Sequence, residues 1–256
     1  MTAAKPWTPD EWAARLAVAV VLPRVNELDN AGRFFRTHRL AIDFRAEGRS
    51  AGILMVGANP DKQASLALSF GSFQRLARAL RGEKVVPLPT RGFWHIVGLL
   101  QIQKLTGRLE GLLHPEDQAS LTTELVARQS RLLLRIALEG GAWLARKGEP
   151  WLRERLRDGP QGRVSFFIEG AVMGGPQVVA MGVGSLQVDG QPAHPSADAS
   201  VTFASPALAS AALRGQLDEV AAVGLGDIVI EGNAALADHL GYLLRRVDYY
   251  LEGRYE

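Results

Sequence analysis

The chain has 256 residues, of which 47% are apolar and 22% are charged, a composition typical of globular proteins that argues against overall disorder. Its 29 Lys and Arg residues nearly balance its 27 Asp and Glu residues, so the net charge of +2 does not indicate binding to nucleic acid. The chain has no cysteine, which excludes disulfides, thiolate metal sites and cysteine nucleophiles.

The N-terminal segment is expected to begin with a helix. Thr8 is a suitable N-cap, Pro9 suits the first helical position, and Glu11 completes a Thr-x-x-Glu capping box. The apolar run 13–22 that follows is shorter than the roughly 20 residues that span a bilayer. Because Asp10 and Glu11 precede it, the run does not resemble a signal peptide, and we expect a cytoplasmic protein without a targeting peptide.

Between residues 40 and 113 the hydrophobic period changes from helical to the two-residue alternation of strands. The turn Asn59-Pro60-Asp61 separates the second and third of these expected strands. The expected elements are strands around 40–45, 53–55 and 66–70, a helix over 73–82, a strand at 85–88, and a helix capped by Thr90 that ends near Leu113.

The second half of the chain is expected to repeat this order after two connecting helices, over 115–138 and 143–156. The expected elements are strands at 164–169, 178–181 and 199–204, a short helix capped by Ser205 and Pro206, a strand at 228–231, and a final helix.

The repeated order is accompanied by repeated residues. The segment 64–68 (Ala-Ser-Leu-Ala-Leu) matches 199–203 (Ala-Ser-Val-Thr-Phe), and Ala-Leu-Arg-Gly occurs at both 79–82 and 212–215. The first copy lacks a counterpart of most of 217–226. Duplication is favoured over coincidence, although few matched residues support it.

The end of the chain carries a family resemblance. A short strand around Ile228 and Ile230 is broken at Gly232-Asn233, and Leu236, Leu240, Leu243, Leu244 and Val247 then recur at helical spacing. This arrangement resembles the closing segment of the sterol carrier protein 2 (SCP-2) family, in which an apolar helix covers a lipid-sized cavity. The resemblance covers 163–251 well and 36–113 weakly.

The resemblance implies an α+β fold with two SCP-2-like lobes, each a mixed or antiparallel sheet covered by helices, joined by a helical linker. The implied segments are an N-terminal helix at 1–35, a degenerate lobe at 36–113, the linker at 114–160, and a lipid-binding lobe at 161–256. The large aromatic residues Phe93 and Trp94 are expected to fill the first lobe. The principal pocket is therefore expected in the second lobe.

The resemblance also indicates which apolar residues would contact a ligand. Each buried methylene of a lipid contributes about 0.8 kcal/mol, so an alkyl tail can bind without specific polar contacts. The alternative, that these residues pack a closed core, stays open. The expected ligand-binding residues are Phe166, Val201, Phe203, Ile228, Ile230, Leu236, Leu240 and Leu243.

Motifs for chemistry are missing from the sequence. The five histidines are scattered, and no Gly-x-Ser-x-Gly elbow occurs. Gly224-x-Gly226 precedes a strand instead of following one, so it does not suit a dinucleotide loop. We therefore expect no enzyme activity, no catalytic residue, no cofactor and no metal site.

The sequence-based hypothesis is non-catalytic binding or transfer of a lipid, sterol-like, acyl or isoprenoid ligand. The alternative is an accessory or scaffold protein that presents a hydrophobic intermediate, such as a quinone precursor, to biosynthetic enzymes. Arginines in the linker, with Trp143 and Trp151, suit a transient membrane surface or a protein partner, but interleaved acidic residues favour a solvated face. The richness in Ala, Arg, Leu and Gly suggests a bacterial source, and the oligomeric state is left open.

Overall fold

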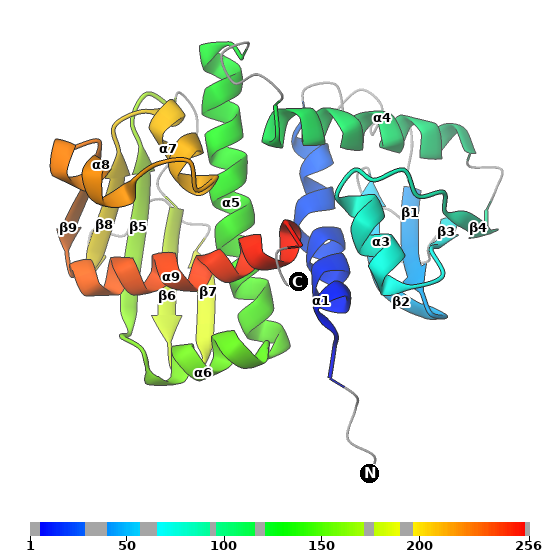
Figure 1. Cartoon of the computed structure of the whole chain (residues 1–256), viewed down its shortest axis with the longest axis horizontal. Helices are drawn as coiled ribbons and strands as arrows, with labels where there is room; N and C mark the ends of the chain where they lie inside the picture. The colour runs from blue at the N-terminus through cyan, green and yellow to red at the C-terminus, as the bar shows by residue number, and fades with distance from the viewer. Residues whose placement is uncertain are drawn as a thin grey trace. The chain divides into compact units, whose positions relative to one another are not determined.

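The computed structural model describes residues 6–28, 40–56, 66–92, 96–115, 121–171, 177–189 and 197–253. The protein is α+β with two mixed sheets, which confirms the expected class (Figure 1). The chain forms two compact units: the first contains 1–115 together with 249–256, and the second contains 116–248. Helices α5 and α6, expected to form a linker, belong to the second unit. The expected division of the chain into segments 1–35, 36–113, 114–160 and 161–256 stays a prediction.

The first unit has a sheet of order β2-β1-β3-β4. Strand β1 pairs antiparallel with β2 and parallel with β3, and β3 pairs antiparallel with β4. The elements are α1 (Pro9–Leu16), the π-helical η1 (Ala17–Val21), the 3-10 helix η2 (Leu22–Glu27), β1 (Leu40–Ala46), β2 (Arg49–Val56), β3 (Leu66–Ser69), α3 (Phe73–Leu80), β4 (Leu88–Arg91) and α4 (Ile96–Leu113).

The expected start of the first helix is confirmed, but its capping box is not closed. The Thr8 hydroxyl accepts a hydrogen bond from the backbone N–H of Glu11 at 3.2 Å. The Glu11 carboxylate is buried and forms ion pairs with Arg15 at 2.9 Å and Arg49 at 3.3 Å. The Glu11 carboxylate, which the capping box would place at the backbone N–H of Thr8, therefore pairs with Arg49 of a distant strand.

The strand expected at 85–88 and the helix expected to begin at Thr90 are both wrongly placed. Strand β4 covers Leu88–Arg91 instead of 85–88, so Thr90 lies within it, and helix α4 begins only at Ile96. The Thr90 hydroxyl donates to the carbonyl of Ala67 on β3 instead of capping a helix. Asn59, Pro60, Phe93 and Trp94 lie outside the described residues.

The second unit has a sheet of order β7-β6-β5-β8-β9. Strand β5 pairs antiparallel with β6 and parallel with β8, while β6 and β8 pair antiparallel with the outer strands β7 and β9. The elements are α5 (Thr123–Lys147), α6 (Pro150–Asp158), β5 (Gly162–Ile168), β6 (Gln177–Gly182), β7 (Ser185–Asp189), β8 (Ala199–Phe203), α7 (Pro206–Leu213), α8 (Glu219–Leu225), β9 (Ile228–Gly232) and α9 (Ala234–Leu251).

The two connecting helices were expected with a break near 140, and this expectation is wrong. A single helix, α5, runs through Gly140 and Gly141. Gly141 lies in close packing: a Cβ there would lie 2.9 Å from Cδ2 of Leu244 and 3.1 Å from Cδ2 of Leu186, so these side chains would have to shift. The glycine allows α9 and β7 to approach α5 closely.

The strand pairings of the second unit reproduce those of the first, apart from the additional strand β7. In each unit a strand pairs antiparallel with the next strand and parallel with the third, and the third pairs antiparallel with the fourth. In each unit a short helix follows the third strand, and a long helix follows the fourth. None of the helices within the described residues is long and apolar enough to cross a bilayer.

Candidate functional site

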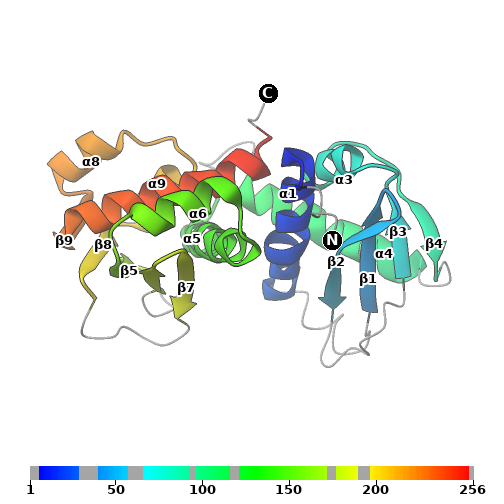
Figure 2. The same cartoon turned by 90° about the horizontal axis from the view of Figure 1, so that it is seen from below.

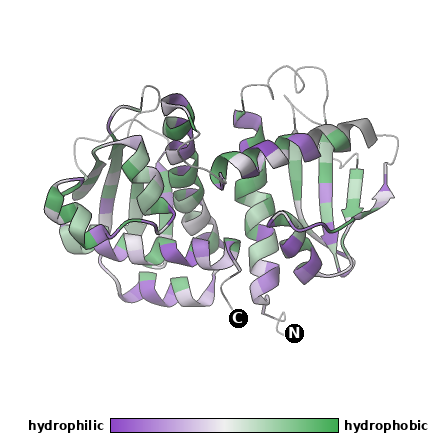
Figure 3. Ribbon diagram, turned by 45° about the horizontal axis from the view of Figure 1, so that its top comes forward, coloured by the Kyte–Doolittle hydropathy of each residue, from purple (hydrophilic) through white to green (hydrophobic). Residues whose placement is uncertain are grey.

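One face of the second sheet is mostly apolar, and Figure 3 shows that the strands of this sheet consist largely of hydrophobic residues. Successive residues of a strand point to opposite faces, and directly paired residues share a face. Val201 pairs with Phe166 on one side and with Ile230 on the other, and Phe203 pairs with Ile228. The register therefore places the following side chains on one face: Val164, Phe166, Val179, Met181, Leu186, Ala199, Val201, Phe203, Ile228 and Ile230.

Helix α9 crosses this apolar face (Figures 1 and 2). A Cβ at Gly162, the first residue of β5, would lie 2.8 Å from Cδ2 of Leu236, so α9 lies against the start of this strand. Two turns later, Leu244 lies close to Leu186 of β7. Leu240 lies between these contacts on the same helix face and is fully buried.

The structure brings the expected ligand-binding residues together. Phe166, Val201, Phe203, Ile228 and Ile230 share the sheet face, and Leu236, Leu240 and Leu243 lie on the buried side of α9. Ile230 is half-buried and the others are buried. Their arrangement suits a site for an apolar group, and their contact with a ligand stays a prediction.

Helix α8 covers the β9 edge of the sheet and has few buried side chains. Ala222 is its one buried residue, whereas Val220 is 84% exposed and Leu225 is 78% exposed. The sequence interpretation missed this helix, because its apolar residues do not form one core-facing stripe. Its ends did carry a signal: Asp218 accepts hydrogen bonds from two backbone N–H groups, and Gly226 adopts the left-handed conformation of a C-terminal cap.

A buried polar pair joins α5 to α7. The Ser210 hydroxyl donates to Oε1 of Gln129 at 2.5 Å, and both side chains are fully buried. One helical turn beyond Ser210, Arg214 has a buried Nε without a hydrogen-bond partner among the described residues. A buried donor without a hydrogen bond costs about 1–3 kcal/mol of stability. Arg214 therefore differs from Ser210 and Gln129, which satisfy each other.

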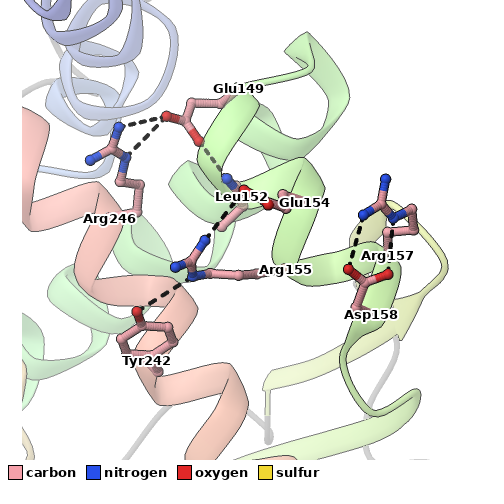
Figure 4. A network of polar contacts seen from close by, with 8 residues as sticks. All are labelled: Glu149, Leu152, Glu154, Arg155, Arg157, Asp158, Tyr242 and Arg246. Atoms are coloured by element: carbon pink, nitrogen blue, oxygen red, sulfur yellow. Dashed lines mark hydrogen bonds and ion pairs between the residues drawn. The ribbon is translucent and has the colours of Figure 1, made fainter.

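A network of polar and aromatic side chains connects α6 to α9 (Figure 4). The Glu149 carboxylate caps α6 by accepting from the N–H of Leu152 at 2.6 Å, and it accepts two hydrogen bonds from Arg246 at 2.7 and 3.0 Å. The Arg155 guanidinium lies 4.4 Å from the centre of the Trp151 ring and donates to the Tyr242 hydroxyl. The network fixes α9 to α6.

The exposed pair Arg157 and Asp158 lies at the end of α6. Their side-chain hydrogen bond raises the pKa of Arg157 and lowers the pKa of Asp158. Both side chains are exposed to solvent, so the pair is a surface feature and not a candidate acid or base.

The described residues offer no evident metal centre. Within them, no group of three or more His, Asp or Glu side chains is arranged to hold a metal ion. His239 packs against Gly159, and its buried Nε2 has no hydrogen-bond partner among the described residues.

No family model and no characterised protein matches the sequence of the chain. Among solved structures, the chain is similar to a UbiJ-SCP2 ubiquinone synthesis protein, at 18% identity, with 44% of this chain and 93% of that chain covered and a TM-score of 0.32. It is also similar to the sterol carrier protein domain 2 of Helicoverpa armigera, at 23% identity, with 47% and 85% covered and a TM-score of 0.31.

A palmitated SCP2L2 from Aedes aegypti is similar at 21% identity, with 42% of this chain and 90% of that chain covered and a TM-score of 0.30. A stereoselective inverting sec-alkylsulfatase, Pisa1 from Pseudomonas sp., is similar at 16% identity and a TM-score of 0.30. That match covers 93% of this chain and 32% of the enzyme, so this chain spans about a third of the enzyme's length.

Proposed function

We propose that the protein binds and transfers a hydrophobic ligand, without catalysis, between the apolar face of the second sheet and helices α7, α8 and α9. The observation that carries this proposal is the weak attachment of α8 at the edge of that face. Elements with few buried side chains open at low free-energy cost. Because α8 buries only Ala222, its displacement would admit a ligand to Ile228 and Ile230 on β9.

The affinity of such a site would come mainly from the hydrophobic effect. A tail of about ten methylenes gains roughly 8 kcal/mol of transfer free energy, before the cost of immobilising it. The exposed Val220, Val223 and Leu225 of α8 would contact the tail in the open state, and they lose little packing when the helix moves. Such a site has little preference among apolar tails.

We further propose that the two units are SCP-2-like lobes related by duplication, and that the second lobe holds the ligand. The same strand pairing in both units supports this, together with the short helix after the third strand. Among the described residues, the second unit has an additional strand, β7, and an additional helix, α8, beside β9, and no counterpart of either is found in the first unit.

The test is native mass spectrometry of the purified protein, with extraction and identification of copurified lipid, followed by titration with a fluorescent C16 fatty acid. A stoichiometric apolar ligand that the fluorescent acid displaces is expected. Absence of both a copurified lipid and saturable binding of the probe would overturn the proposal.

A scaffold that presents a hydrophobic intermediate, such as a quinone precursor, to enzymes is the second candidate, and the α6–α9 network favours it. Tyr242 is 46% exposed beside Arg155 and Trp151, and aromatic side chains beside arginine are enriched at protein interfaces. Affinity capture with the full chain, followed by the same capture with Tyr242→Ala, tests this candidate. Loss of biosynthetic enzymes from the Tyr242→Ala sample, with lipid binding unchanged, is the expected result.

A further inference from the structure

We propose that the Arg214-Gly215 turn at the end of α7 binds the anionic headgroup, a carboxylate or a phosphate, of the apolar ligand. This inference rests on the proposed function, because the tail of the ligand would lie on the adjoining sheet face. Helix α7 packs on both α5 and β8, and β8 carries Val201 and Phe203 of that face. The inference adds a polar determinant to a site that is otherwise apolar.

Arg214 has the hydrogen-bonding capacity that such a headgroup requires. Its Nε is buried and lacks a hydrogen-bond partner, and no acidic residue in the described part of the chain forms an ion pair with it. The neighbouring Ser210 hydroxyl already donates to Gln129. A guanidinium presents its donors in a planar fork that matches a carboxylate or a phosphate, so a bound anion would satisfy Nε together with a terminal nitrogen.

The first unit contains a turn of the same construction, which serves as an internal comparison. Helices α3 and α7 are both eight residues long and are capped by Ser72 and Ser205. Each ends at an arginine of similar conformation, with φ −95° and ψ 16° at Arg81 and φ −98° and ψ 6° at Arg214. The next residue in each case is a glycine with positive φ.

The two turns differ in what lies beside the glycine. At Gly82 a Cβ would collide with Oε1 of Glu110, so a carboxylate of α4 already lies against this turn. At Gly215, no atom of the described residues other than the glycine and its two chain neighbours lies within 4 Å of the position that a Cβ would take. The first unit therefore places its own carboxylate at the Arg-Gly turn, and the second has room there for a carboxylate from a ligand.

The experiment compares a fluorescent C16 fatty acid with the C16 alcohol that carries the same fluorophore, by equilibrium titration. The unaltered protein is expected to bind the acid about tenfold more tightly than the alcohol. Arg214→Gln should weaken binding of the acid to the level of the alcohol and leave the alcohol unchanged. Arg214→Lys, which keeps the charge but not the fork, should retain part of the preference.

Arg153→Gln is the matched control, because Arg153 is exposed on α6 and the charge change is the same. It should leave both affinities unchanged. Acetate and inorganic phosphate at millimolar concentration should not displace the acid, and displacement would overturn the inference by showing a site for free anions. Equal binding of acid and alcohol by the unaltered protein, or equal loss of both in Arg214→Gln, would also overturn it. Failure of the unaltered protein to bind either probe would instead contradict the proposed function itself.

Discussion

The two units pair four strands in the same way, but they differ in which side chains lie beside the turn after the third strand and along the edge of the sheet. In the first unit Glu110 occupies the Arg-Gly turn after the third strand. In the second unit the corresponding turn at Gly215 is open, and helix α8 at the sheet edge leaves its apolar side chains exposed. The same strand order therefore allows different surroundings, because helix α4 supplies a carboxylate beside one turn and no described residue does so beside the other.

The largest effect should come from removing α5 from the second unit. A fragment of residues 158–256 loses the helix that packs against Leu186, Leu244 and Ser210, so it should lack a cooperative unfolding transition. A fragment of residues 116–256 keeps this helix and should unfold cooperatively in urea. Cooperative unfolding of the shorter fragment would show that the segment 114–160 is a linker, as the sequence suggested.

Leu240→Asp should have the next largest effect. Leu240 is fully buried on α9 between the contacts of Leu236 and Leu244, so the substitution introduces an unpaired charge into the apolar site. We expect a loss of more than about 4 kcal/mol of stability, and loss of probe binding by whatever remains folded. Leu225→Asp makes the same change at an exposed position and should cost less than about 0.5 kcal/mol. Undiminished binding by a folded Leu240→Asp protein would remove α9 from the site.

Arg246→Met should be destabilising because it removes two hydrogen bonds from the buried Glu149 carboxylate. Glu149 is 1% exposed, and breaking a buried ion pair typically costs about 3 kcal/mol. Arg245→Met on the same helix removes an ion pair with Glu219 that is 69% and 54% exposed, so its cost should be below about 0.5 kcal/mol. Urea denaturation of both variants measures the difference. Equal costs would show that the α6–α9 network does not stabilise the second unit.

Local features of the fold could be predicted from the sequence because they depend on neighbouring residues. The caps at Thr8 and Ser205 and the alternation of the β8 residues are confirmed. The same alternation correctly placed the expected sheet residues of the site on one face.

The errors arose where distant contacts decided the structure. The expected break between 138 and 143 does not occur, because Gly141 packs close to Leu186 and Leu244 within one continuous helix. Strand β4 consists of exposed residues and includes Pro89, so it has no apolar alternation to detect. Strand β7 was missed, because its few residues follow closely on the turn at Gly184. The Arg214 site could not be predicted, because an unpartnered buried nitrogen is a property of the folded surroundings.

The smallest expected effect on stability comes from replacing the glycines of the two Arg-Gly turns. Gly82 and Gly215 have φ values of +84° and +63°, so alanine at either position should cost about 1–2 kcal/mol through backbone strain. Gly82→Ala should cost about 0.5–1 kcal/mol more, because its methyl group must displace the Glu110 carboxylate, the end of a flexible side chain. In a Glu110→Ala background this additional cost should disappear, and the two glycine substitutions should become equal in urea denaturation. An equal cost with Glu110 present would show that no carboxylate rests against the first turn, and the contrast between the two units would lose its basis.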